Sequence, residues 1–118
     1  MHNELELNGY NIATVIHPFT SLAKDVNIGK GCTLNTSCTV DHDSIIGDFV
    51  HLSPGVSLAG EVQVGNSTWL GINSTIINKI SITGNCILGA GSVVIRDITE
   101  EGIYGGNIAK RIGNISKK

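Results

Sequence analysis

The sequence predicts an all-β fold made of short strands that alternate with tight turns. Three observations support this prediction: a large aliphatic residue recurs every six positions, a mostly small residue follows it at a fixed interval, and glycine and asparagine recur between them. The aliphatic position is filled without a break at Ile16, Leu22, Ile28, Leu34, Val40, Ile46, Leu52, Leu58, Val64, Leu70, Ile76, Ile82, Leu88 and Val94. This period excludes a helical face, which repeats at about 3.6 residues, and a short fixed period is typical of solenoids.

The second position lies four residues after each aliphatic one and completes the predicted strand and turn. It is occupied by Cys32, Cys38, Ser44, Val50, Val56, Val62, Thr68, Ser74, Ile80, Cys86 and Ser92. One large and one small inward side chain in each hexad describe a flat strand followed by a turn. Glycine directly follows the aliphatic position at Gly29, Gly47, Gly65, Gly71 and Gly89. With nearby asparagines such as Asn66, Asn73 and Asn85, these glycines suggest a tightly turning backbone with positive φ.

The six-residue repeat resembles that of the hexapeptide-repeat acyltransferase superfamily. The resemblance covers residues 12 to 112 and implies a left-handed parallel β-helix in which three hexads complete one triangular coil. The left hand is implied by the family, because parallel crossovers are otherwise right-handed. We expect one domain over residues 1–118, with β-helix coils at 12–98 and a C-terminal tail at 99–118. Each coil would bury its apolar face only against its neighbours.

Composition narrows the possible functions. A formal net charge of -2 and 15% charged residues provide no basic surface for nucleic acid. No apolar run reaches the roughly eighteen residues of a membrane-spanning helix, and the first residues lack a signal-peptide pattern. The three cysteines all occupy the small inward position, which fits reduced structural thiols. We therefore expect a cytoplasmic protein with neither a nucleic-acid nor a membrane partner.

Longer segments narrow the resemblance. The stretches "VDHDSIIGDFVHLSPGVSLAGEVQVG", "LGINSTI", "ILGAGSVVIRD" and "GGNIAKR" are similar to those of sugar acetyltransferases of the NeuD and PglD type. That similarity implies direct transfer of acetyl from acetyl-CoA to an amino or hydroxyl group of a small acceptor. The expected acceptor is a sugar or a nucleotide-linked sugar. The similarity also implies a homotrimer with its active sites between subunits, and no metal.

Two histidines carry the expected chemistry. His42 and Asp43 fall on the corner that follows inward Val40, and by the resemblance His42 is the general base. Imidazole suits this role because it titrates near neutral pH, and Asp43 would orient it or raise its basicity. His51 lies between two inward residues, so it stands outward on a flat face half a coil away. Only a neighbouring subunit could therefore bring a copy of His51 near His42.

The other candidate residues rest on the resemblance. It gives the cofactor-binding positions as His51, Gly60, Ile72, Ala90 and Lys110, with His51 near the thioester, and it puts Asn35 near the acceptor. Lys110 and Arg111 could meet the CoA phosphates. They precede another basic pair, however, and so also fit a solvated tail. Trp69 is expected only to pack at a subunit contact or strand face.

Two features depart from the NeuD and PglD pattern. The related signature G-x-P-A-K has proline where this chain has Ile108. Those relatives also carry a small Rossmann-like domain before the coil, whereas here the coil begins almost at once. We expect either a piece of a longer protein or a protein that lacks the acceptor-binding domain.

Two other functional classes remain open. A zinc enzyme of the γ-carbonic anhydrase type would need three converging histidines, for which His17, His42 and His51 are the candidates. Their intervals of 25 and 9 residues do not resemble the ligand spacing of that family. A coil that serves only as a scaffold or assembly element is the stronger alternative, because the same fold can carry different functions.

Overall fold

Strands of mostly two residues form three sheets around one core. A computed structural model describes residues 14–115, and no helix in this range is long and apolar enough to cross a membrane. The first sheet contains β1 (Val15–Ile16), β4 (Thr33–Leu34), β7 (His51–Leu52), β10 (Trp69–Leu70), β13 (Cys86–Leu88), β15 (Gly102–Gly105) and β16 (Lys110–Gly113). The second contains β2 (Ser21–Leu22), β5 (Thr39–Val40), β8 (Ser57–Leu58), β11 (Thr75–Ile76) and β14 (Val93–Val94). The third contains β3 (Asn27–Ile28), β6 (Ile45–Ile46), β9 (Gln63–Val64) and β12 (Ser81–Ile82).

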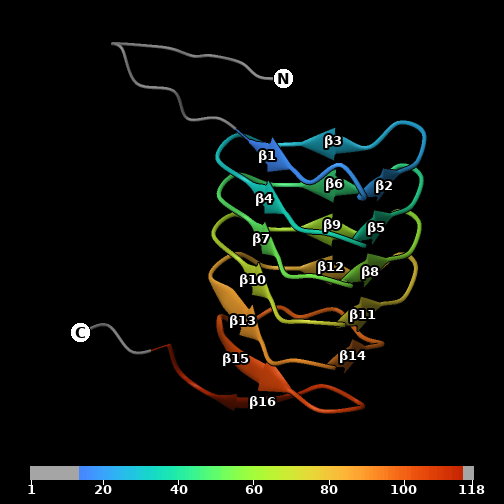
Figure 1. Ribbon diagram of the computed structural model, residues 1–118. Coiled ribbons are helices and arrows are strands. Elements are labelled where there is room, and N and C mark those ends of the chain that lie inside the picture. The colour runs from blue at the N-terminus through green and yellow to red at the C-terminus, as the bar shows by residue number, and fades with distance from the viewer. Residues whose placement is uncertain (1–13, 116–118) are drawn as a thin grey trace, which may run out of the picture.

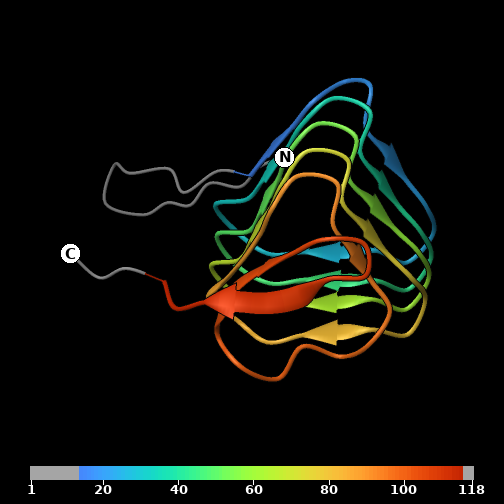
Figure 2. The same ribbon diagram turned by 90° about the horizontal axis from the view of Figure 1, so that it is seen from below.

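Successive coils are stacked in parallel register. Thr33 pairs with His51, and His51 pairs with Trp69, so each full coil contains three hexads. Backbone hydrogen bonds join the coils, as where Thr33 N donates to Val50 O at 3.0 Å. Figure 1 shows the strands of each sheet one above another, and the coils superimpose when viewed along the axis in Figure 2. The predicted all-β fold is confirmed as a β-solenoid of about 5 turns that matches the left-handed β-helix acetyltransferases.

The two predicted inward positions form the core. From Leu34 to Val94 every large aliphatic position is buried, as are the small positions from Cys32 to Ser92. Cys32, Cys38 and Cys86 are all 0% exposed and free, as the repeat predicts. Buried hydroxyls bond to the backbone of the next coil, as where Ser44 Oγ donates to Ala59 O at 3.0 Å. Ser74 Oγ likewise donates to Gly89 O at 3.2 Å, so hydroxyls in the core can be satisfied between coils.

Three corners connect the sheets, and positive φ occurs in them at residues other than the glycines expected to have it. We call them the first corner (from the first sheet to the second), the second corner (second to third) and the third corner (third to first). The glycines that follow the aliphatic position do not have positive φ. At Gly71, a Cβ would lie 2.6 Å from Leu88 O, so glycine is needed there for close approach of the coils. Positive φ occurs instead at corner residues such as Asp43 and Asn73, each with a φ of 60°.

The C-terminal segment continues the first sheet. β15 pairs in parallel with β13, so that Cys86 lies opposite Gly102. The chain then reverses and β16 pairs antiparallel with β15. The Asn107–Ile108 peptide bond is cis, and Ile108 is the residue that replaces the proline of the related signature. The sheet structure thus extends beyond residue 98, where the predicted coils end.

The difference in burial between two leucines of the repeat predicts a difference in what their substitution costs in stability. Leu52 is 0% exposed between two full coils, whereas Leu22 occupies the same repeat position in the first described coil and is 39% exposed. Leu52→Ala should lower the free energy of unfolding by about 2–5 kcal/mol, because it leaves a cavity between coils. Leu22→Ala is the matched control and should cost clearly less. Urea unfolding at one fixed protein concentration measures both, and equal losses would contradict the described packing.

Candidate active site

The second corner presents His42 and Asp43 because the residues around them point inward. Val40 and Ser44 are 1% and 0% exposed, so the chain between them must turn outside the core. Asp43 has positive φ, and this turn lets neighbouring side chains both face outward. The Asp41 carboxylate accepts a hydrogen bond from His42 N at 2.7 Å and so holds the start of the corner. Both residues lie where the repeat predicts them.

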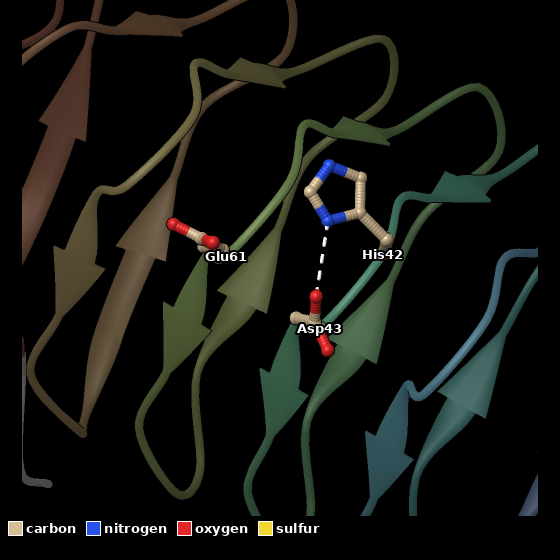
Figure 3. A group of neighbouring side chains, drawn as sticks. All are labelled: His42, Asp43 and Glu61. Carbon is tan, nitrogen blue, oxygen red and sulfur yellow. Dashed lines mark hydrogen bonds and ion pairs between the residues drawn. The ribbon is translucent and has the colours of Figure 1, made fainter.

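His42 and Asp43 form a hydrogen-bonded pair. His42 Nδ1 lies 3.2 Å from Asp43 Oδ2 (Figure 3). Because a carboxylate only accepts hydrogen bonds, Nδ1 carries the proton of the neutral ring and Nε2 keeps a free lone pair. The hydrogen bond that Nδ1 donates to Asp43 raises the pKa of His42, and the negative charges of Asp41 and Glu61 act in the same direction. His42 therefore has the form and raised basicity of a proton acceptor.

Gly60 makes room for the His42 ring. It occupies the same corner position one coil further on, and Glu61 N donates to His42 O at 2.9 Å to join the two corners. A Cβ on Gly60 would lie 2.6 Å from His42 Nε2 and 2.7 Å from Cε1. Since Gly60 does not have positive φ, space and not backbone conformation explains the glycine. Asn78, one coil beyond, shows that the corner itself accepts a side chain.

Glu61 brings a second carboxylate to this corner. One possible ligand atom from each of His42, Asp43 and Glu61 lies within 4.8 Å of the others, and Figure 3 shows Glu61 on the neighbouring coil. A nitrogen and two carboxylate oxygens could contact a divalent cation, but all three side chains are exposed. The histidines of the zinc alternative do not converge within the chain. His17 directly follows β1 and His51 begins β7, both in the first sheet, whereas His42 lies at the second corner.

His51 lies on the first sheet in a different environment. The Trp69 ring stacks on the imidazole with a centroid distance of 4.1 Å and an interplanar angle of 22°. Asn35 Nδ2 lies 3.3 Å from His51 Nε2. Partial burial lowers the pKa of His51, opposite to the shift at His42. Asn35, expected near the acceptor, therefore lies beside His51 and on a different part of the coil from His42.

The remaining candidates are spread over other parts of the surface. Ile72 and Ala90 occupy the first corner in adjacent coils, and both are exposed. Lys110 begins β16 and is exposed. Arg111 is engaged, because Nη2 and Nε donate to Glu101 O at 2.9 and 3.1 Å. The guanidinium thus ties the C-terminal strand to the last coil, which favours a structural role for Arg111 over a phosphate contact.

A shallow groove runs along the outer face of the second sheet. Its volume is about 550 Å³, and its lining includes the small outward residues Ser21, Ala23, Thr39, Ser57, Ala59 and Thr75. The lining reaches Asp41 and Asn78, which belong to the second corner. The groove therefore leads along the coils to the edge where His42 and Gly60 meet.

Two residues near the histidines were not expected from the sequence. Trp69 lies one full coil after His51, and Glu61 lies one full coil after Asp43. The parallel register makes such pairs neighbours, as the pairing of Trp69 with His51 shows. Stepping by one coil from each candidate residue would have found both.

The fold and the repeated sequence define a hexapeptide-repeat β-helix, and similar proteins are acetyltransferases. No family model matches the chain. Serine acetyltransferase 4 of Arabidopsis thaliana is 29% identical over 111 residues, which cover 87% of this chain and 30% of the plant protein. The expected resemblance to hexapeptide-repeat acetyltransferases is thus confirmed at the level of sequence.

Solved structures show the same similarity. The acetyltransferase domain of PglB from Neisseria gonorrhoeae has a TM-score of 0.77 and 28% identity, covering 88% of this chain and 60% of that one. A variant of perosamine N-acetyltransferase from Caulobacter crescentus, in complex with CoA and GDP-perosamine, has a TM-score of 0.69 and 30% identity. This match covers 86% of the present chain and 57% of the perosamine N-acetyltransferase chain. The match therefore spans 30% to 60% of the length of these three proteins.

The contact of Gly60 with His42 predicts how the pair responds to an added methyl group. Gly60→Ala should displace the His42 ring, since a side chain moves more easily than the backbone of the coil. With the Asp43 hydrogen bond disturbed, the pKa of His42 should fall toward its ordinary value. Histidine proton NMR against pH measures this shift, and Asn78→Ala at the next corner is the control. An unchanged His42 pKa in Gly60→Ala would contradict the assigned contact.

Proposed function

We propose that this chain is an acetyl-CoA-dependent acetyltransferase with His42 as its general base. The observation that carries the proposal is the His42–Asp43 pair on an exposed corner, in which Nδ1 is bonded to the carboxylate and Nε2 bonds to none of the described residues. The acetyl donor is supported by the similar acetyltransferases, among them structures in complex with acetyl-CoA or CoA. Because the acetyl-CoA thioester is already activated, the transfer needs a positioned base and no metal.

The proposed reaction transfers acetyl in one direct displacement. The amino or hydroxyl group of the acceptor attacks the thioester carbonyl carbon while His42 Nε2 takes its proton. A C–N or C–O bond forms, the C–S bond breaks, and the leaving CoA thiolate takes the proton from the imidazolium. Asp43 stabilises that imidazolium through the Nδ1–H bond. A covalent cysteine intermediate is disfavoured, because burial raises the pKa of the Cys32, Cys38 and Cys86 thiols.

The proposed active site lies between subunits of a homotrimer. His42 and His51 occupy different parts of the coil, so a single chain does not bring them together. The exposed apolar residues Trp69 and Ile87 on the first sheet, with exposed fractions of 51% and 37%, are available for a subunit contact. In such a trimer His42 and Gly60 of one subunit would face His51 of the next. Acetyl-CoA would also contact Ile72, Ala90 and Lys110.

The proposed acceptor is a sugar or a nucleotide-linked sugar. Its support is the similarity to perosamine N-acetyltransferase, whose structure contains GDP-perosamine. The chemistry at His42 serves an amine and a hydroxyl alike, since either must lose a proton on acylation. A cytoplasmic location would give the enzyme both acetyl-CoA and nucleotide sugars.

Acetyl-CoA binding is the first test of this function. Isothermal titration with acetyl-CoA should show binding to the wild-type chain that is retained in His42→Ala and weakened at least several-fold in His51→Ala. The expected difference arises because His42 acts on the acceptor proton and His51 on the thioester. His17→Ala removes an exposed histidine outside the proposed site and is the matched control. Failure of the folded wild-type protein to bind acetyl-CoA would leave the scaffold alternative.

Mixing two variants tests whether the site is shared between subunits. Co-expression of His42→Ala and His51→Ala chains should restore acetyl transfer in mixed trimers, because one interface then combines both intact histidines. Random assembly places a native pair at about a quarter of the sites, so activity should recover to about a quarter of the wild-type value. CoA release with amino-sugar acceptors measures it at low acetyl-CoA concentration. Activity no greater than the sum of the separate variants would contradict a shared site.

A further inference from the structure

The Asn35 side-chain amide has one permitted orientation. Its Nδ2 atom lies 3.0 Å from Leu52 O, a backbone carbonyl that can only accept a hydrogen bond. If the amide were turned over, the oxygen of Asn35 would face this carbonyl oxygen. The same carbonyl also accepts a hydrogen bond from the backbone N of Asn35 at 3.0 Å. The strand thus fixes Nδ2 as the amide atom that faces the first sheet.

The fixed amide determines which nitrogen of His51 carries the proton. Nδ2 has two hydrogens; one bonds to Leu52 O, and the other is directed at His51 Nε2, 3.3 Å away. Nε2 must therefore accept, so the proton of neutral His51 lies on Nδ1. In a protonated ring, Nε2–H would meet the N–H of Asn35. This contact disfavours the imidazolium in the same direction as the burial that lowers the pKa of His51.

Trp69 holds the imidazole from its other side. The two rings are nearly parallel at a centroid distance of 4.1 Å, which limits rotation of His51. The side chains that contact the ring, Asn35 and Trp69, are both uncharged, and burial lowers the pKa of His51. Burial and these uncharged contacts therefore both favour the neutral state of His51.

We propose that Asn35 and Trp69 are positioning residues that hold His51 as the neutral Nδ1–H tautomer. None of the described residues accepts a hydrogen bond from Nδ1, so this N–H remains available to a ligand. This step rests on the proposed acetyl transfer: the Nδ1–H group of His51 donates to the carbonyl oxygen of acetyl-CoA, where negative charge develops during attack. His51 then serves as a hydrogen-bond donor and not as a base, and Asn35 acts on the acetyl donor and not on the acceptor.

The tautomer can be measured directly on the wild-type protein without any ligand. Two-bond ¹H–¹⁵N NMR spectra of the ¹⁵N-labelled chain, recorded above neutral pH, distinguish a protonated from an unprotonated ring nitrogen. We expect His51, assigned by its loss in His51→Gln, to show protonated Nδ1 and unprotonated Nε2. A wild-type ring with its proton on Nε2 would overturn the proposal, and this measurement depends on no variant at Asn35.

Substitution of Asn35 tests the cause of this tautomer. Asn35→Asp replaces the amide donor with an acceptor of the same shape, so it should favour Nε2–H and raise the His51 pKa by about one unit or more. Trp69 is the only tryptophan in the chain and stacks on His51, so its fluorescence reports the titration of the ring. The wild-type midpoint should lie below about 6.5, and Asn35→Ala should move it upward by less than Asn35→Asp.

Two controls separate positioning from damage to the fold and from the proposed reaction. Asn27→Asp adds the same charge at an exposed residue of the third sheet and should leave the Trp69 titration unchanged. An unshifted midpoint in folded Asn35→Asp would overturn the role of Asn35. In calorimetry at a pH below the raised pKa of His51, Asn35→Asp should weaken acetyl-CoA binding at least several-fold. If the tautomer is found but the wild-type chain does not bind acetyl-CoA, the positioning role stands and the donor role toward the thioester is overturned.

Discussion

The equal length of the coils is the constraint on which the rest of the structure depends. Each two-residue strand obtains its hydrogen bonds from strands one coil away, as in the pairing of Thr33, His51 and Trp69. A strand this short has no stability of its own, so it persists only while its neighbours keep the register. One additional residue in a coil would exchange inward and outward side chains for the remainder of that coil. Outward and corner positions are therefore where the sequence is free to carry chemistry.

The core could be predicted almost completely, because burial in this fold repeats with the sequence period. Its limit is the first described coil, where Ile16 and Leu22 keep the aliphatic pattern but are 42% and 39% exposed. A repeat position states which way a side chain points and not whether another coil covers it. The glycines illustrate a second limit. The pattern located them, but the reason for Gly71 is contact with Leu88 O, and periodicity does not distinguish close approach from positive φ.

For the candidate site, the places of the residues in the fold were predictable, and their contacts less so. The phase of the repeat is enough to put His42 on a corner and His51 on a flat face. Neighbours one coil apart could also have been derived, since Gly60 follows His42, and Trp69 follows His51, by one full coil. Asn35 is different, because it is not separated from His51 by one full coil of the sequence. Their contact also depends on the orientation of one amide. Such a contact requires side-chain geometry, which no period contains.

The two histidines show how one repetitive scaffold can prepare the same side chain for opposite tasks. At His42 a carboxylate accepts from Nδ1, so Nε2 is left as a base with a raised pKa. At His51 an amide is directed at Nε2, so Nδ1–H is left as a donor on a ring with a lowered pKa. The proposed acetyl transfer uses both forms, a proton acceptor for the nucleophile and a donor for the carbonyl oxygen. Because an exposed corner and a stacked sheet face produce these two forms separately, the proposed function requires a second subunit to bring them together.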